Sequence, residues 1–424
     1  MTAAKDHRGR PVVAVTGIGV VTSLGVGMTD NWAALTAGRS GIHRIVRFSI
    51  GGLRTTVAGT VDFLDNVPPT AGKLTERFAV LAAEEAIEQA RIGAPRRFPG
   101  PLFAAVPPVE VDWPQRIELY AAAETGTGYA RLFAAARTGQ FAQMHALVSF
   151  GWPADRIAER FGTQGVPVSL STACASGASA IQLGLDALRR GECEAALCLG
   201  TDGSVQPETL IRFSLLSALS TQNDPPEQAA KPFSKDRDGF VVAEGAAALV
   251  LESLDSARAR GAPVLAIVRG CGERADDFHR TRSKPDGSSI IGAIERALED
   301  AGVTPEGVDY VNAHGTGTPE NDRMEYLALS TVFGEALADT AVSSNKSMIG
   351  HTLTAAGAVE AAFTIMTIQA GRIPPTINYQ VPDPAIPLDV VPNVARDAQV
   401  ATALSNSFGF GGQNVCLVLS AEPS

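Results

Sequence analysis

A strand-like run that turns directly into a helix of small residues constrains this chain most strongly. Residues 166–170 (VPVSL) are apolar and partly β-branched, and the sequence Ser-Thr-Ala-Cys follows at once. From Ala175 to Arg190, Ala, Gly, Ser and Leu recur at helical spacing until Gly191 ends the pattern. A strand that leads into a helix is the repeating unit of α/β proteins. The pattern therefore places Cys174 in a tight turn between a strand and the first turn of a helix.

The rest of the chain repeats this alternation. Short apolar runs predict strands over residues 12–15, 195–199, 246–251, 308–311 and 415–419, and helical spacing predicts helices over residues 73–91, 129–136 and 290–301. We expect the first strand to end in a glycine turn at Gly17 and Gly19. The order restarts after Gly261, which predicts two halves, residues 1–260 and 261–424, in one compact body. No repeat is apparent in the sequence itself.

Composition excludes several classes of protein. The chain has 424 residues, enough for two or three domains, and 35 basic against 45 acidic residues give a net charge of −10. This acidic balance argues against nucleic acid as the main ligand. Five scattered cysteines do not form a disulfide scaffold, so we expect a reducing, cytoplasmic setting. Gly and Thr interrupt the apolar run 12–26, and no uninterrupted apolar stretch is long enough to predict a membrane span or a signal peptide.

Cys174 is the candidate nucleophile. Its small neighbours (SLSTACASGASA) permit a sharp turn that presents the side chain. The amides at a helix N-terminus carry partial positive charge, so we expect the pKa of this thiol to be lowered. The other four cysteines lie in or beside apolar runs and are interpreted as core residues: Cys193, Cys198, Cys271 and Cys416.

Two histidines lie in separate glycine-flanked turns. His314 follows the strand at 308–311 within NAHGTGTPEND, and His351 follows Lys346 within NKSMIGHTLTAAG. Glu360 comes nine residues after His351, on an Ala-rich helix. A single histidine is more often structural. Two of them together with a lysine and a helix-capped cysteine favour nucleophilic catalysis, whereas no metal-binding spacing is present.

Two glycine-rich segments have distinct interpretations. The C-terminal SNSFGFGGQN (405–414) could present backbone N–H groups to an oxyanion and hold an aromatic gate, or it could be an ordinary turn before the last strand. The early TGIGVV invites a dinucleotide-binding interpretation, but Thr22 stands where the third glycine is needed. That interpretation is rejected.

Together the Cys174 turn, NAHGTGT, NKSMIGH–AAG and the terminal NSFGFGG resemble the β-ketoacyl-acyl carrier protein synthases, most closely the elongating type II condensing enzymes. The resemblance covers nearly the whole chain and is weak from about residue 90 to 165. It implies an α/β thiolase-like fold, in which two similar βαβ halves form a five-layered α-β-α-β-α body, and normally a homodimer.

The resemblance also implies an activity: decarboxylative condensation of malonyl-acyl carrier protein with an acyl chain held on Cys174, with no cofactor beyond the carrier's phosphopantetheine. His314 and His351 would assist decarboxylation, Lys346 would orient them and pair with Glu360, and Glu325 would support the site. The N–H groups of Cys174 and Phe410 would form an oxyanion hole that Phe410 gates. Two threonines, Thr316 and Thr318, match the residues whose hydroxyls hold the pantetheine arm in the family. A further group matches a structural cation site of some members: Asn312, Glu325, Glu360, Ser405 and Asn406.

Several departures leave the substrate and partner open. Residues 102–113 read LFAAVPPVEVDW where the family has a glycine-rich loop, and residues 113–160 also differ. Gln413 replaces a usual Thr and Ala243 a usual Gly. The alternatives are a polyketide or specialised-lipid synthase and a noncatalytic partner subunit, and the intact Cys174 argues against the latter. The partner could be a second copy or a related synthase. An acidic carrier protein would need a local basic patch, for which Lys73, Arg77 and Arg212 are candidates.

Overall fold

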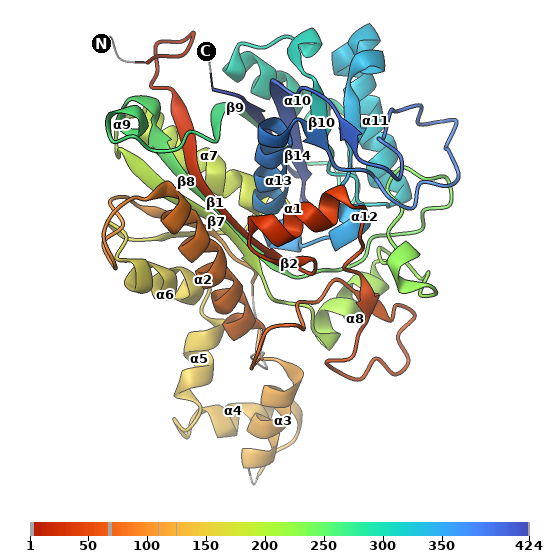
Figure 1. Ribbon diagram of the computed structural model, residues 1–424. Helices are drawn as coiled ribbons and strands as arrows, with labels where there is room; N and C mark the ends of the chain where they lie inside the picture. The colour runs from red at the N-terminus through yellow and green to blue at the C-terminus, as the bar shows by residue number, and fades with distance from the viewer. Residues whose placement is uncertain (1–3, 67–69, 109, 124, 423–424) are drawn as a thin grey trace.

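One mixed sheet of eleven strands forms the framework of the protein. The computed structural model describes residues 4–66, 70–108, 110–123 and 125–422 (Figure 1). The strands of this sheet are β1 (Val13–Thr22), β2 (Gly25–Val26), β5 (Leu102–Ala105), β6 (Val168–Leu170), β7 (Ala195–Asp202), β8 (Gly245–Ser253), β9 (Ala266–Ala275), β10 (Tyr310–Asn312), β11 (Ala341–Ser343), β14 (Thr402–Phe408) and β15 (Gln413–Ser420). Their order is β11-β10-β14-β15-β9-β1-β8-β7-β5-β6, and β2 pairs with β1.

This sheet consists of two units with the same connectivity. In the order β1-β8-β7-β5-β6, the first two pairs are antiparallel and the last two are parallel. The order β9-β15-β14-β10-β11 repeats this pattern pair by pair. The units join where β1 pairs with β9, from Val13 opposite Val268 to Val15 opposite Ala266. The two similar halves that the resemblance implied are therefore present in the topology.

Helices cover both faces of each unit. Helix α2 (Ala71–Ala90) packs on β1, β8 and β7, and α10 (Ser288–Ala301) packs on β9 and β15 with α11 (Pro319–Phe333) beside it. Helices α7 (Ser176–Arg189) and α13 (Ala356–Ala370) contact each other, and each also contacts strands of both units (Figure 1). The layers thus run α-β-α-β-α, as expected.

The expected glycine turn at the end of the first strand is wrong. Strand β1 continues through Gly17 and Gly19 to Thr22. A Cβ atom at Gly17 would lie 2.0 Å from the carbonyl oxygen of Ala86, and one at Gly19 would lie 2.1 Å from that of Ala82. Glycine is needed there because α2 lies directly against the strand.

The same device recurs in the second unit. Gly270 and Gly272 in β9 face α10, and a Cβ atom at Gly272 would lie 2.1 Å from the carbonyl oxygen of Ala293. In the central layer, a Cβ atom at Gly177 of α7 would lie 2.4 Å from the Ala358 nitrogen. Gly357 of α13 makes the reciprocal approach to α7. The two halves therefore repeat their closest backbone contacts as well as their topology.

The divergent region forms a helical lobe that projects from this body (Figure 1). Its projecting helices are α3 (Trp113–Ala122), α4 (Gly128–Ala136) and α5 (Ala142–Val148), and α6 (Trp152–Phe161), which follows them, packs on α2. Neither α3 nor α5 has a buried residue. The remaining elements are α1 (Met28–Thr36), α8 (Pro207–Leu215), α9 (Leu254–Ala259), α12 (Lys346–Ile349), the hairpins β3 (His43–Arg44) with β4 (Val57–Ala58) and β12 (Arg372–Ile373) with β13 (Arg396–Asp397), and short 3-10 turns, among them η4 (Leu353–Ala355).

Burial agrees with the sequence analysis in two further respects. By length and composition alone, the helical stretch Leu353–Ala370 could cross a membrane, but 83% of it is buried inside the protein, as in the core helix of a globular body. All five cysteines are free thiols. Cys198 and Cys416 are buried in the core, and Cys193 and Cys271 pack partly against it.

Candidate active site

The turn at Cys174 has the form that its small residues predict. Ala173 adopts φ +50°, in the left-handed region, and α7 begins at Ser176. The Ser176 hydroxyl fixes the turn, because it accepts a hydrogen bond from the Thr172 N–H (2.8 Å) and donates one to the Ala173 carbonyl (2.5 Å). Strain at a non-glycine residue is typical of turns that present a functional side chain.

The expected lowering of the Cys174 pKa is wrong. Burial raises the pKa of this thiol to about 11. The backbone N–H of Phe410, which donates a hydrogen bond to the sulfur, and the charge of Lys346 both act to lower it but are outweighed. The free-energy cost of desolvating a thiolate in this turn exceeds the stabilisation that its surroundings offer. The resting nucleophile is therefore the neutral thiol.

The structure brings the widely separated site residues to one hollow. Cys174, His314, His351 and Phe410 all line it, and its volume is only about 70 Å³. Thr316 and Thr318 lie in the same wall, where their hydroxyl groups are 3.0 Å apart. Other lining residues, which the sequence analysis missed, are Phe213, Phe240, Asp276, His279, Arg280 and Arg282.

Lys346 and Glu360 form a buried ion pair beside His314. Their side chains are 2% and 1% exposed, and the Lys346 ammonium donates to Glu360 Oε1. Lys346 Nζ also lies 3.4 Å from His314 Nδ1. Since an ammonium group can only donate, Nδ1 must accept and the imidazole proton resides on Nε2. This pairing was expected from the sequence.

Both histidines are neutral. Burial, followed by the nearby charge of Lys346, lowers the pKa of His314 and of His351 well below its ordinary range. The two rings lie edge to face with centroids 5.3 Å apart. Neutral imidazoles can donate a hydrogen bond to a developing oxyanion without first losing a proton to solvent.

Glu325 holds the loop that carries His314. Its two carboxylate oxygens accept the backbone N–H groups of His314 (2.8 Å) and Gly315 (2.7 Å), and Asn406 Nδ2 donates to it at 3.1 Å. Burial raises the Glu325 pKa to about 6. Its contacts with substrate-facing residues are through the backbone, so its place in the structure is a positioning one.

Next to this carboxylate, several buried oxygen atoms lack hydrogen-bond partners among the described residues. They are Asn312 Oδ1, Glu360 Oε2, Ser405 Oγ and Asn406 Oδ1. Buried oxygens are normally satisfied, and a set of carbonyl, hydroxyl and carboxylate oxygens suits a hard cation. Within the described ranges, no group of three or more His, Cys, Asp or Glu side chains could hold a metal ion. The residues expected at a cation site therefore fit an alkali cation rather than a transition metal.

Two loops meet at the mouth of the hollow. Gly411 donates its N–H to the Arg280 carbonyl and Asp276 donates its N–H to the Gly412 carbonyl, both at 2.7 Å. Phe410 packs on Phe213 of α8, with ring centroids 6.5 Å apart. The 276–283 loop (DDFHRTRS) is a polar run of mixed charge after a strand, which by itself does not indicate a site.

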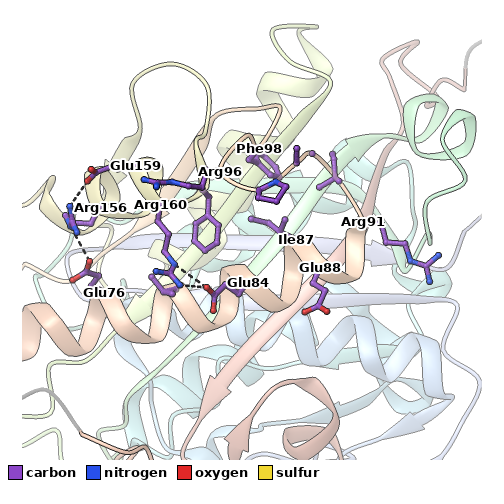
Figure 2. Close-up of a pocket in the computed structure, with 16 residues that line it drawn as sticks. Glu76, Glu84, Ile87, Glu88, Arg91, Arg96, Phe98, Arg156, Glu159 and Arg160 are labelled. Atoms are coloured by element: carbon purple, nitrogen blue, oxygen red, sulfur yellow. Dashed lines mark hydrogen bonds and ion pairs between the residues drawn. The ribbon is translucent and has the colours of Figure 1, made fainter.

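A second hollow, of about 990 Å³, lies between α2, α6 and residues 91–98 (Figure 2). Ion pairs cross it, from Arg156 to Glu76 (3.4 Å) and from Arg160 to Glu84. No cysteine or histidine lines it. Strand β7 separates α2 from α7, so this groove lies on the opposite side of the sheet from Cys174. Its ion pairs fasten the lobe helix α6 to α2.

Known proteins are similar to this chain in sequence and in fold. The family models described as the N-terminal and C-terminal domains of β-ketoacyl synthase match residues 10–257 and 265–380. The ketoacyl synthase alpha subunit of the tetracenomycin polyketide synthase of Streptomyces glaucescens is 37% identical, with 96% of each chain covered. The 3-oxoacyl-[acyl-carrier-protein] synthase 2 of Coxiella burnetii is 36% identical, over 96% of this chain and 98% of that protein.

Solved structures agree. A ketosynthase bound to a hexaketide, in complex with its type II polyketide synthase acyl carrier protein, superposes with a TM-score of 0.87 at 30% identity, over 97% of this chain and all of that one. A β-ketoacyl synthase from Burkholderia phymatum gives 0.84 at 32% identity, with the same coverage. The fold and the site thus define a thiolase-type ketosynthase. The chain belongs to the β-ketoacyl synthase family and is an acyl-transferring condensing enzyme.

Proposed function

We propose that this protein is an elongating 3-oxoacyl-[acyl carrier protein] synthase of fatty acid biosynthesis. The Cys174 sulfur attacks the thioester carbonyl of an acyl chain, forms a new C–S bond and releases the carrier's phosphopantetheine thiol. Malonyl-carrier protein then loses carbon dioxide, and the resulting carbanion attacks the Cys174 thioester. A C–C bond forms, the C–S bond to Cys174 breaks, and the chain leaves two carbons longer on the carrier.

The observation that carries this proposal is the convergence of Cys174, the Phe410 N–H and two neutral histidines on one hollow. The N–H groups of Cys174 and Phe410 would hold the acyl oxyanion. His314, with its Nε2 proton available, and His351 donate to the malonyl thioester oxygen as it becomes an enolate. Thr316 and Thr318 receive the pantetheine arm, and no further organic cofactor takes part.

We assign the unpartnered oxygens beside Glu325 to a structural alkali cation. Asn312, Glu360, Ser405 and Asn406 supply the oxygen atoms, and Glu325 adds charge. The cation would fix the ends of β10 and β14, from which the His314 loop and the Phe410 loop extend. It would take no part in bond making.

A polyketide or specialised-lipid pathway is the second candidate. It is favoured by the similarity to a polyketide ketosynthase alpha subunit and by the divergent lobe of α3 to α6. A noncatalytic partner subunit is disfavoured by the intact nucleophile.

The test is to supply a radiolabelled acyl primer and malonyl-carrier protein, and to identify the product by mass spectrometry. Label on Cys174 and a product two carbons longer support the proposal. A Cys174→Gln variant should lose condensation yet retain decarboxylation of malonyl-carrier protein. Repeated extension without reduction would instead assign the enzyme to polyketide synthesis, and absence of both labelling and product would identify a noncatalytic subunit.

Its partners would be an acyl carrier protein and a second copy of the chain, in the cytoplasm. Helices α3 and α4 expose large apolar side chains, among them Trp113 (57%), Tyr129 (78%) and Phe133 (63%), and the edge strand β6 exposes Val168. Apolar surface of this extent favours a protein partner.

Sedimentation should give a dimer that Tyr129→Glu with Phe133→Glu weakens. A monomer would contradict this expectation. Dimerisation only with a related synthase would indicate a heterodimer.

A further inference from the structure

The backbone of His351 is held by a segment that lies about 110 residues earlier in the chain. His351 donates its N–H to the Val241 carbonyl (2.7 Å), and its own carbonyl accepts the N–H of Ala243 (2.9 Å). His351 thereby forms a parallel bridge with Val242. No regular helix or strand includes His351, so this bridge fixes the backbone from which the imidazole extends.

A buried ion pair anchors the next residue of that segment. The Glu244 side chain has no exposed surface, and Arg47 binds both of its oxygens, at 2.6 and 2.9 Å. Glu244 Oε2 also accepts the Val61 N–H (3.2 Å), and the Glu244 N–H donates to the Gly59 carbonyl (3.0 Å). Through these contacts, the carboxylate and the backbone N–H of Glu244 bind residues that lie close to β3 and β4 in the sequence.

Arg47 is itself fixed in place. Its guanidinium donates to Asp62 at 2.7 Å, and Asp62 in turn contacts His43 at 3.1 Å. A bidentate arginine–carboxylate pair is both strong and directional. Removing Arg47 would leave Glu244 as a buried carboxylate without a counter-charge, which is costly enough that the 241–244 segment should move toward solvent.

We propose that Arg47 and Glu244 are positioning residues for His351. Glu244 ties the 241–244 segment to Arg47, and this segment holds the His351 backbone. This role rests on the proposed function, in which His351 takes part in decarboxylation. The pair therefore serves the decarboxylation half of the reaction. The acylation of Cys174 depends on the α7 turn and the Phe410 N–H, so it is independent of this pair.

The test compares Arg47→Met, Arg47→Lys and a matched control. Arg260→Met removes the partner of Glu252, which is 1% exposed and lies at the other end of β8. We expect Arg47→Met to lower the decarboxylation rate of malonyl-carrier protein at least tenfold and to leave the acylation of Cys174 within threefold of wild type. Arg47→Lys, which retains the charge, should recover much of the loss. Arg260→Met should lower the melting temperature without separating the two rates.

Hydrogen exchange at the His351 and Ala243 amides provides a readout that needs no activity. Exchange at both should accelerate in Arg47→Met, to a lesser degree in Arg47→Lys, and remain at the wild-type rate in Arg260→Met. Parallel loss of decarboxylation and acylation, unchanged exchange, or the same selective effect in Arg260→Met would overturn the inference. Wild-type protein that neither decarboxylates malonyl-carrier protein nor acylates Cys174 would instead refute the proposed function, while the exchange result would still decide whether the pair holds His351.

Discussion

Burial sets the state of the nucleophile at Cys174. Its location at the start of a helix predicts a lowered thiol pKa. Desolvation, however, raises this pKa by more than the helix lowers it. With the pKa raised to about 11, roughly one thiol in 10⁴ is ionised at pH 7. The thiol proton must therefore leave as the sulfur attacks the thioester.

Alkylation of Cys174 tests this state directly. The rate of modification by iodoacetamide should rise about tenfold per pH unit from pH 7 to pH 10 without a plateau, because only the thiolate reacts. Mass spectrometry of the peptide that contains Cys174 measures the rate, and Cys193, which is partly exposed, is the internal reference. A plateau below pH 8 would show that the helix does lower the pKa.

Lys346 determines the protonation of its neighbours. Its charge depresses the pKa of both histidines, and its contact with Nδ1 fixes the tautomer of His314. In Lys346→Met, we expect decarboxylation to fall about 100-fold, within the range for loss of a positioned proton donor. Burial, the larger cause of the lowered histidine pKa values, remains in this variant, but loss of the Lys346 charge should raise both pKa values, so the acid limb of the activity profile should shift to higher pH.

The pH–rate profile, with histidine NMR signals as a second measure, checks this. Lys5→Met removes an exposed lysine near Pro11 and should behave as wild type. A loss below threefold together with an unchanged pH profile would contradict the assigned role of Lys346.

At the scale of elements, local patterns predicted well what they themselves determine. The strand–turn–helix at Cys174, the strand before His314 and the Ala-rich helix that carries Glu360 all depend on near neighbours in the sequence, and each was correct. The turn at Gly17 was wrong because glycine is required there by α2, which lies about 65 residues later. Similarly, the polar run at 276–283 reaches the hollow only through tertiary contacts.

The internal duplication leaves only a short trace in the sequence. Gly17 and Gly19 recur as Gly270 and Gly272, in both cases on the first strand of a unit and under a helix. The signal is only two residues long in each half, too short for a sequence repeat. Its meaning depends on the helix that packs on each strand.

The crossing of α7 and α13 should be intolerant of added volume. A Cβ atom at Gly357 would lie 2.5 Å from the Ala178 nitrogen and 2.9 Å from its Cβ atom. Because helix backbones cannot yield as a side chain can, we expect Gly357→Ala to destabilise the protein by about 3 kcal/mol, at the upper end of overpacking costs. Urea unfolding followed by circular dichroism measures this. Gly151→Ala, at a site with open space and φ −76°, should be neutral, and equal stability of the two variants would refute the close crossing.

At the scale of the whole molecule, the net charge of −10 differs from the charge around the hollow, where Arg280 and Arg282 lie with Asp276 and Glu320. The chain carries −10, yet a family substrate arrives on an acidic carrier. Of the basic residues selected from the sequence, Arg212 is paired with Glu110 and Arg77 donates to the Asn66 carbonyl. Arg280 and Arg282 are exposed and line the hollow that contains Cys174. Folding thus places a second basic group nearer to the reaction than the one the sequence suggested.

Charge reversal distinguishes these two groups. If the carrier docks over the hollow, Arg280→Glu with Arg282→Glu should raise the KM for malonyl-carrier protein about tenfold and leave kcat unchanged, because rim charges act on encounter rather than on chemistry. The effect should fade near 0.5 M salt, where the screening length is only a few ångströms. A malonyl thioester without the carrier protein should react at the wild-type rate.

Lys73→Glu with Arg77→Glu tests the alternative patch. The control is Arg190→Glu, which lies just after the C-terminal end of α7, whereas Cys174 lies before its N-terminal end. An effect that persists at high salt, or that equals the control, would place the docking surface elsewhere.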